Sequence, residues 1–158
     1  MKQQSLRIIS GGQTGVDRAA LDAALQAGVP CGGWCPEGRL AEDGVIPAKY
    51  PLIELEGGGY AERTKKNVIN SDGTVIIYFG DINGGTELTR QICVSMARPL
   101  LLIDATKTDV DTAVQMLTEF ITLNDVNTFN IAGPRASKDD RAYHDTFNIM
   151  YEFLNTYE

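Results

Sequence analysis

Short apolar runs alternate along the chain with longer stretches in which apolar residues recur every three or four positions. The short runs have the length and the β-branched content of strands, whereas the longer period is that of helices that pack through one face. The expected strands cover residues 6–10, 29–36, 74–79, 100–103 and 128–132, and the expected helices cover residues 16–27, 61–71, 87–97, 109–123 and 138–155. This alternation predicts an α/β fold, a single Rossmann-like ligand-binding domain over residues 1–158 with a doubly wound, mostly parallel sheet flanked by helices.

The segment 37–60 departs from this alternation because it is rich in glycine and proline. A connection of this length inside a compact domain usually carries a function or contains small elements of its own. Its one alternating run, at residues 51–56, has the pattern of a strand. Whether residues 52–56 join the main sheet is open at this stage.

Three glycine-rich turns each follow an expected strand and precede an expected helix. They contain Gly11, Gly12, Gln13, Thr14 and Gly15 in the first turn, Gly80, Gly84, Gly85 and Thr86 in the second, and Gly133 and Arg135 in the third. In a parallel sheet such turns open on one edge, where helix starts offer unpaired N–H groups and a partial positive charge. The three turns together predict a pocket for an anionic, phosphorylated small molecule.

The three turns differ in how specifically they indicate a phosphate site. The first matches neither the G-x-G-x-x-G fingerprint nor a Walker loop, and a tight strand-to-helix turn explains its glycines equally well. Thr14 and Asp17 are spaced like a capping box at the helix start. The second turn places two glycines and the Thr86 hydroxyl at a helix start, and the third adds Arg135, a planar donor suited to phosphate, with Ser137 as a cap for the next helix.

Arg63 and Asn67 extend this candidate site, because they stand four residues apart and share one helix face. For Arg63, contact with a ligand and simple coverage of the surface are equally good interpretations. Asp43 in Glu42-Asp43-Gly44 has the ordinary place of a turn-forming aspartate.

Amino-acid composition limits the kinds of binding partner that the protein can have. An apolar content of 43% is that of a globular chain, and the net charge of −7 disfavours nucleic acid and anionic membranes, which need a basic surface. Residues Met1–Ser5 lack the apolar core of a signal peptide, and three cysteines form an odd set. These features predict a reduced, cytoplasmic setting. Cys31 and Cys35 lack a second ligand pair, and His144 is the only histidine, so neither a metal site nor a nucleophilic triad is expected.

Several strings together resemble the putative molybdenum carrier family, within the wider Rossmann-like group that includes lysine-decarboxylase-like and DNA-processing proteins. They are Gly11-Gly12-Gln13-Thr14-Gly15-Val16-Asp17-Arg18, Gly33-Trp34-Cys35-Pro36, Ala41-Glu42-Asp43-Gly44, Arg63-Thr64-Lys65-Lys66-Asn67-Val68, Ser71-Asp72-Gly73-Thr74, Gly84-Gly85-Thr86 and Ala132-Gly133-Pro134-Arg135. The resemblance implies a Rossmann-like fold, a homo-oligomer (dimer or tetramer) and a pocket for the molybdenum cofactor or molybdate. Molybdoenzymes are the recipients that it implies.

Two alternatives come from the wider group. Its nucleotide-cleaving members resemble P-G-G-x-G-T-x-x-E, in which the glutamate acts on an N-glycosidic bond, whereas here Glu87 follows Thr86 directly and Thr89 takes the expected position. Glu87 or Asp17 would have to take the role of the missing glutamate. The second alternative is a sensor for ADP-ribose or another nucleotide derivative. The leading hypothesis is a non-catalytic binding protein. The apolar residues Phe129, Tyr143 and Tyr151, near the ends of expected helices and strands, are candidates for a subunit interface.

Overall fold

The computed structural model describes residues 6–157, so the segment Met1–Ser5, on which the signal-peptide expectation rests, lies outside it. The main sheet has five strands in the order β2-β1-β9-β7-β8, and all of its neighbouring strands are parallel. The strands are β1 (Arg7–Ile9), β2 (Cys31–Gly32), β7 (Gly73–Tyr78), β8 (Leu100–Asp104) and β9 (Thr128–Ala132). The Rossmann-like α/β prediction is confirmed.

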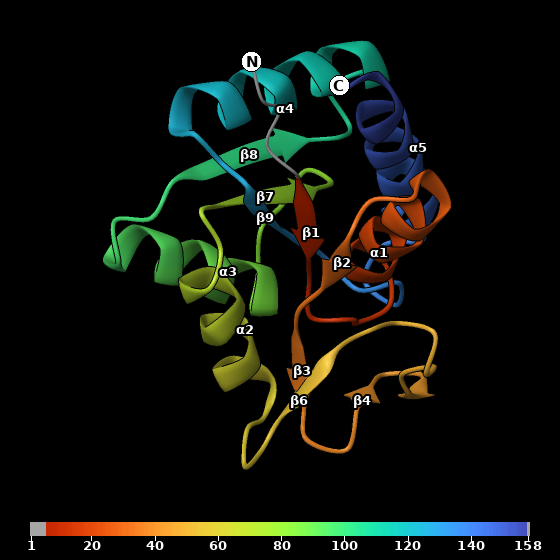
Figure 1. The fold of residues 1–158 in the computed structure, drawn as a ribbon, viewed down its shortest axis with the longest axis vertical. Helices are drawn as coiled ribbons and strands as arrows, with labels where there is room; N and C mark the ends of the chain where they lie inside the picture. The colour runs from red at the N-terminus through yellow and green to blue at the C-terminus, as the bar shows by residue number, and fades with distance from the viewer. Residues whose placement is uncertain (1–5, 158) are drawn as a thin grey trace.

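The helices lie on both faces of this sheet (Figure 1). One face packs against α1 (Val16–Ala27), α4 (Val110–Asn124) and α5 (Ala142–Thr156), whose apolar residues share one buried cluster with Ile8, Val75 and Ile131. The other face meets the shorter helices α2 (Tyr60–Ile69) and α3 (Gly84–Ser95). Within the main sheet, each crossover between consecutive strands therefore passes through a helix, as is usual for parallel strands.

The strand order has a simple interpretation when β9, the last strand in the chain, is counted first. The order β2-β1-β9-β7-β8 then becomes 3-2-1-4-5, which is the Rossmann order 3-2-1-4-5-6 without its last strand. The direction of winding reverses between β9 and β7. In open α/β sheets ligands bind at such a switch point, outside the carboxyl ends of the strands.

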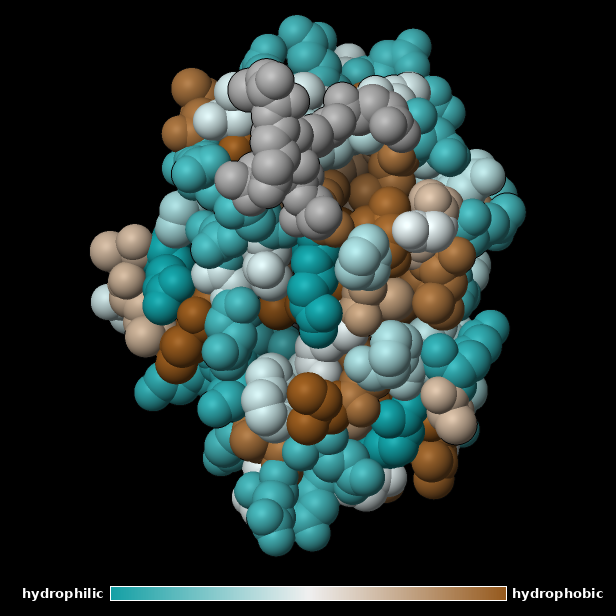
Figure 2. Space-filling model, in the orientation of Figure 1, coloured by the Kyte–Doolittle hydropathy of each residue, from teal (hydrophilic) through white to brown (hydrophobic). Residues whose placement is uncertain are grey.

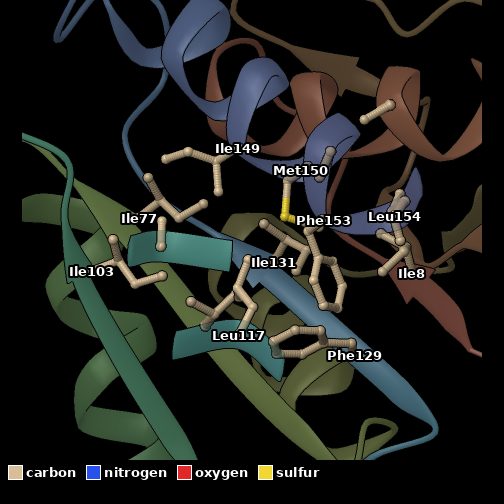
Figure 3. Close-up of a cluster of buried hydrophobic side chains, with 14 of the residues drawn as sticks. Ile8, Ile77, Ile103, Leu117, Phe129, Ile131, Ile149, Met150, Phe153 and Leu154 are labelled. Atoms are coloured by element: carbon tan, nitrogen blue, oxygen red, sulfur yellow. The ribbon is translucent and has the colours of Figure 1, made fainter. Parts of the chain in front are cut away.

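The core lies between the sheet and the layer of α1, α4 and α5. Figure 3 shows Phe129 and Ile131 of β9 against Met150 and Phe153 of α5, and all four are at most 1% exposed. Phe129 also stacks on Phe120 with ring centroids 5.8 Å apart. Phe129 is therefore a core residue, and its expected place in a subunit interface is wrong. Tyr143 is 39% exposed and stacks on Phe147.

The expected strand 29–36 is wrong, because it divides into β2 and β3 (Trp34–Pro36) in two different sheets. Gly33 separates them at φ 127, and a Cβ there would lie 2.1 Å from the Ser10 carbonyl oxygen. β3 pairs in parallel with β6 (Ile53–Leu55), so the run 52–56 forms a small second sheet and stays outside the main one. β4 (Leu40–Ala41) and β5 (Gly44–Val45) form a short hairpin.

The observed helix boundaries agree best with the predicted ones where a residue in the sequence clearly ends the helix. α1 has the predicted bounds because Gly28 ends it at φ 73 in the left-handed region. α3 begins at Gly84 and not at residue 87, so the glycines belong to its first turn. α5 begins at Ala142 and not at residue 138, because turns occupy the preceding residues and Asp139 accepts from the Arg141 amide.

The surface seen in Figure 2 is mostly hydrophilic, with hydrophobic side chains gathered toward the side of α1 and α5. Within residues 6–157, no helix combines the length and the apolar character that crossing a membrane would need.

Candidate functional site

A cavity of about 490 Å³ opens at the carboxyl edge of the sheet, where β9 and β7 meet. Of the predicted site residues, the cavity lining includes Gly11, Gln13, Arg63, Asn67, Gly85, Thr86, Gly133 and Arg135. The lining does not include Gly12, Thr14, Gly15, Gly80 and Gly84. Residues from all three glycine turns thus meet at one cavity.

The second turn leaves its backbone donors open. The first amide of α3 bonded within the helix is that of Glu87, which donates to the Asn83 carbonyl oxygen at 3.2 Å. The N–H groups of Gly84, Gly85 and Thr86 precede it and have no acceptor among residues 6–157, and Asn83 provides no side-chain cap. A Cβ on Gly85 would meet nothing within 4 Å, so open space lies above this helix start.

Lys138 contributes a cation to the same place. Its Nζ lies 3.7 Å from the position that a Cβ on Gly84 would take, and it has no ion-pair partner in the described part of the chain. The helix dipole and the ammonium group both favour negative charge here. The start of α3, with Lys138 beside it, is the open cradle of this site.

The first turn is filled by the protein's own carboxylate. Asp17 Oδ2 accepts from the Gln13 amide and from Arg63 Nη1, both at 3.3 Å. Asp17 and Arg63 side chains are each only 10% exposed. Burial raises the pKa of Asp17, whereas Arg63 and the amides of Gln13 and Gly11 act in the opposite direction.

The ion pair between Asp17 and Arg63 requires glycine at position 11. A Cβ at Gly11 would lie 1.5 Å from Arg63 Nη1, so only glycine lets the guanidinium reach Asp17. The expected capping box is wrong: α1 has Gly15 at its N-cap, with φ 81 and no side-chain cap. Gly15 lies against the third turn, and its Cβ would meet the Pro134 carbonyl oxygen at 2.5 Å.

The third turn is also filled, by Glu42 from the β4–β5 hairpin. The Glu42 carboxylate accepts from the Ser137 amide at 3.1 Å and from the hydroxyls of Ser137 and Thr14. It also forms an ion pair with Arg135, whose Nε lies 3.1 Å away and donates to the Ser137 hydroxyl oxygen. Partial desolvation raises the pKa of Glu42, but these hydrogen bonds and Arg135 outweigh it and lower the pKa. Ser137 therefore holds Glu42, and its expected role as the cap of α5 is wrong.

The other predicted residues have structural partners of their own. The Asn67 amide bonds the Trp34 backbone N–H at 2.9 Å and carbonyl at 3.0 Å, which fixes α2 to β3. The Gly80 amide donates to Asp104 at 3.1 Å. Gly12, at φ 80, packs against Leu52.

Sequence reasoning missed several residues that line the cavity. Lys138, Asn83 and Glu42 were not singled out as site residues, and Asp17 was considered only for a cap or for catalysis. Asn130, 3% exposed on β9, donates to the Thr74 hydroxyl at 3.2 Å. A polar residue in the middle of an apolar strand is a signal that could have found it. Glu42 had no local signal, because its partners on the third turn are 95 residues away.

Glu87, the acidic residue after Thr86, is not one of the residues that line the cavity. Glu87 pairs with Arg90 at 2.6 Å and accepts from Gln91, and these bonds lower its pKa to about 2. Thr89, at the position where nucleotide-cleaving relatives carry glutamate, does line the cavity. Within residues 6–157 no group of three His, Cys, Asp or Glu side chains is placed to hold a metal ion.

The chain is similar to a known family and to a solved structure over nearly its whole length. The family model described as "circularly permutated YpsA SLOG family" matches residues 8–154. A crystal structure from Syntrophus aciditrophicus SB, of a protein named "putative molybdenum carrier protein", is 42% identical and superposes with a TM-score of 0.92. The match covers 97% of this chain and 98% of that one. The search of curated proteins finds no match.

Proposed function

The chain belongs to the circularly permutated YpsA family of the SLOG group, and on that premise we propose that it binds an anionic, phosphorylated small molecule without transforming it. The name of the Syntrophus protein makes the molybdenum cofactor, or molybdate, the first candidate ligand. A strand order that becomes 3-2-1-4-5 when β9 is counted first agrees with the permutation in the family's name. The permutation keeps the switch point, and with it the usual place of a ligand.

The observation that carries the proposal is the open start of α3. Among residues 6–157 the amides of Gly85 and Thr86 have no acceptor, and both residues line, together with Lys138, a cavity of about 490 Å³, within the usual size range of small-molecule pockets. The amide of Gly84, next to them and beside the Lys138 ammonium group, likewise has no acceptor in the described part of the chain. Donors without acceptors suit a phosphate group or molybdate, since both are oxyanions with several acceptor oxygens. The neutral side chain of Asn130 offers the non-ionic part of a ligand a polar contact on β9.

Titration of molybdate and of inorganic phosphate tests the proposal. Gly85→Val places a branched side chain in the space above the helix start, and nothing within 4 Å obstructs the Cβ. We expect it to weaken binding of both anions about tenfold or more, because it blocks access to the amides. Ser95→Val, at the exposed end of the same helix, is the matched control and should leave affinity unchanged. Equal affinity of wild type and Gly85→Val would contradict the proposal.

Lys138→Met tests the cation separately. Loss of the ammonium group should weaken phosphate binding several-fold, and the loss should shrink as salt screens the charge. Lys107→Met, on an exposed turn after β8, is the control for removing one positive charge.

The identity of the ligand needs a different measurement. Mass spectrometry of small molecules that co-purify with the protein, with elemental analysis for molybdenum and fluorescence of oxidised pterin, distinguishes the candidates. A thermal shift with ADP-ribose but not with molybdate would favour the sensor alternative. The homo-oligomer, the molybdoenzyme recipients and the cytoplasmic setting stay predictions.

One observation favours nucleotide cleavage as a second candidate. Asp17 is a buried carboxylate that lines the cavity, and its raised pKa is a common property of catalytic acids. Release of free base from nucleoside monophosphates, abolished by Asp17→Asn, would support it. Against it stands the pairing of Asp17 with Arg63, which ties the carboxylate to the first turn.

A further inference from the structure

The third turn holds Glu42 in the way that a binding protein holds an oxyanion. The donors are one backbone N–H of Ser137 and the hydroxyls of Ser137 and Thr14. The guanidinium of Arg135 adds an ion pair with Glu42, while its Nε–H donates to the Ser137 hydroxyl oxygen. These are the donor types that recognise phosphate: a planar cation, hydroxyls and a backbone amide. The carboxylate that they hold comes from a different part of the chain, the turn of the β4–β5 hairpin.

This turn is a distinct place from the open cradle, but the two adjoin through Lys138. The Lys138 amide donates to the Arg135 carbonyl oxygen at 3.0 Å, so its backbone belongs to the third turn. Its ammonium group lies at the start of α3. Glu42, Arg135 and Lys138 all line the same cavity.

We infer that Thr14, Arg135 and Ser137 form a second anion subsite, which Glu42 occupies in the free protein and which receives the second phosphate of a diphosphate-containing ligand. The inference rests on the proposed function, because the first phosphate is held by the amides of α3. Binding of a diphosphate then requires the Glu42 carboxylate to leave its donors and enter water. Glu42 thereby disfavours diphosphates relative to single phosphate groups.

Displacement of Glu42 would also release part of the hairpin's attachment. The Glu42 backbone amide donates to the Gln13 side chain at 2.9 Å, and the neighbouring Asp43 pairs with Arg18 at 2.7 Å. The Asp43 pair does not involve the third turn, so it holds the hairpin while Glu42 moves. Asp43 is for the same reason a matched control: it is the adjacent residue, carries the same charge and contacts a different cation.

The experiment measures the dissociation constants of inorganic phosphate and inorganic pyrophosphate by calorimetry for wild type, Glu42→Ala, Glu42→Gln and Asp43→Asn. We expect Glu42→Ala to raise the preference for pyrophosphate over phosphate about tenfold, since the charge-assisted donors become available. Glu42→Gln should give a smaller rise, because the amide still fills the subsite without a charge. Asp43→Asn should leave the preference within about twofold, since general charge effects act on both anions. Adding Arg135→Ala to Glu42→Ala should return the preference toward the wild-type value.

An unchanged preference in Glu42→Ala, with phosphate binding intact and still sensitive to Gly85→Val, would overturn the second subsite alone. Absence of binding of both anions in every variant would overturn the proposed function together with it. An equal rise in Asp43→Asn would assign the effect to net charge and would also overturn the subsite. Circular dichroism of each variant shows whether the fold is retained, and Glu42→Gln, which keeps the size and most hydrogen bonds of Glu42, maintains the test if Glu42→Ala does not fold.

Discussion

The first and second glycine turns look alike in sequence, yet one is closed and the other is open. In the first turn, the Asp17 carboxylate accepts from the Gln13 backbone amide and is paired with Arg63. In the second, the amides of Gly84, Gly85 and Thr86, beside Lys138, have no acceptor within the residues that the structure describes. Glycine in the first turn makes room for the protein's own side chains, whereas glycine in the second leaves room for a ligand. The difference teaches that a glycine turn predicts an anion site that is open in the free protein only when no internal carboxylate fills it.

The largest expected effect comes from breaking the closed turn. Arg63→Ala leaves the Asp17 carboxylate buried without its cation, so we expect the free energy of unfolding to fall by about 3 kcal/mol or more. Arg90→Ala removes a partly exposed pair with Glu87 and should have a much smaller effect, because water screens the two charges. Urea denaturation measures both. Similar losses in the two variants would contradict the assignment of Asp17 and Arg63 as a buried pair.

Alanine at one glycine of each turn sharpens the comparison. Gly15→Ala forces an alanine to φ 81 and a Cβ to within 2.5 Å of the Pro134 carbonyl oxygen, so it should destabilise the fold by roughly 2 kcal/mol. Gly85→Ala meets no atom within 4 Å and lies inside a helix, so it should stabilise the fold by about 0.5 kcal/mol. Thermal unfolding of both proteins checks the opposite signs. A loss of stability in Gly85→Ala would show that the space above α3 is not open.

The two internal carboxylates should give pH effects of opposite sign, which are the smallest of the expected effects. The pKa of Asp17 is raised in the folded state, so its contribution to stability is present below its usual value of 3.8 and falls as the pH rises through the folded-state pKa. The pKa of Glu42 is lowered, so its contribution is present above 4.5 and is lost as the pH falls. Asp17→Asn should therefore remove a decline with rising pH, and Glu42→Gln a decline with falling pH. Denaturation midpoints measured over a pH series check both pH dependences. A dependence of the opposite sign in either variant would contradict the prediction.

Local patterns were enough to predict most of the fold. α1 and β9 have the predicted bounds, because an amphipathic period ended by Gly28 defines the helix and an apolar run before Gly133 defines the strand. The expected strand 29–36 failed at Gly33, since the constraint there is the Ser10 backbone of another strand. No property of residues 29–36 by themselves carries that information.

The site was predictable as a place but not in its detail. The glycine turns predicted the edge of the sheet at which the cavity lies, and Gly85, Thr86 and Arg135 line this cavity. Which turn stays open depends on Asp17 and Glu42, whose hydrogen bonds join residues far apart in the chain, such as Glu42 to Ser137. Long-range pairing of this kind leaves no periodic or spacing signal in one sequence.

The most direct test of the open second turn is an amide NMR titration with inorganic phosphate. Phosphate bound at the start of α3 should give its largest saturable shifts at the amides of Gly84, Gly85 and Thr86, because it accepts hydrogen bonds from them. The amides of Gly11 and Gln13, which face the Asp17 carboxylate, should shift little. Larger saturable shifts in the first turn than at the start of α3, or no saturable shift in either, would contradict the account.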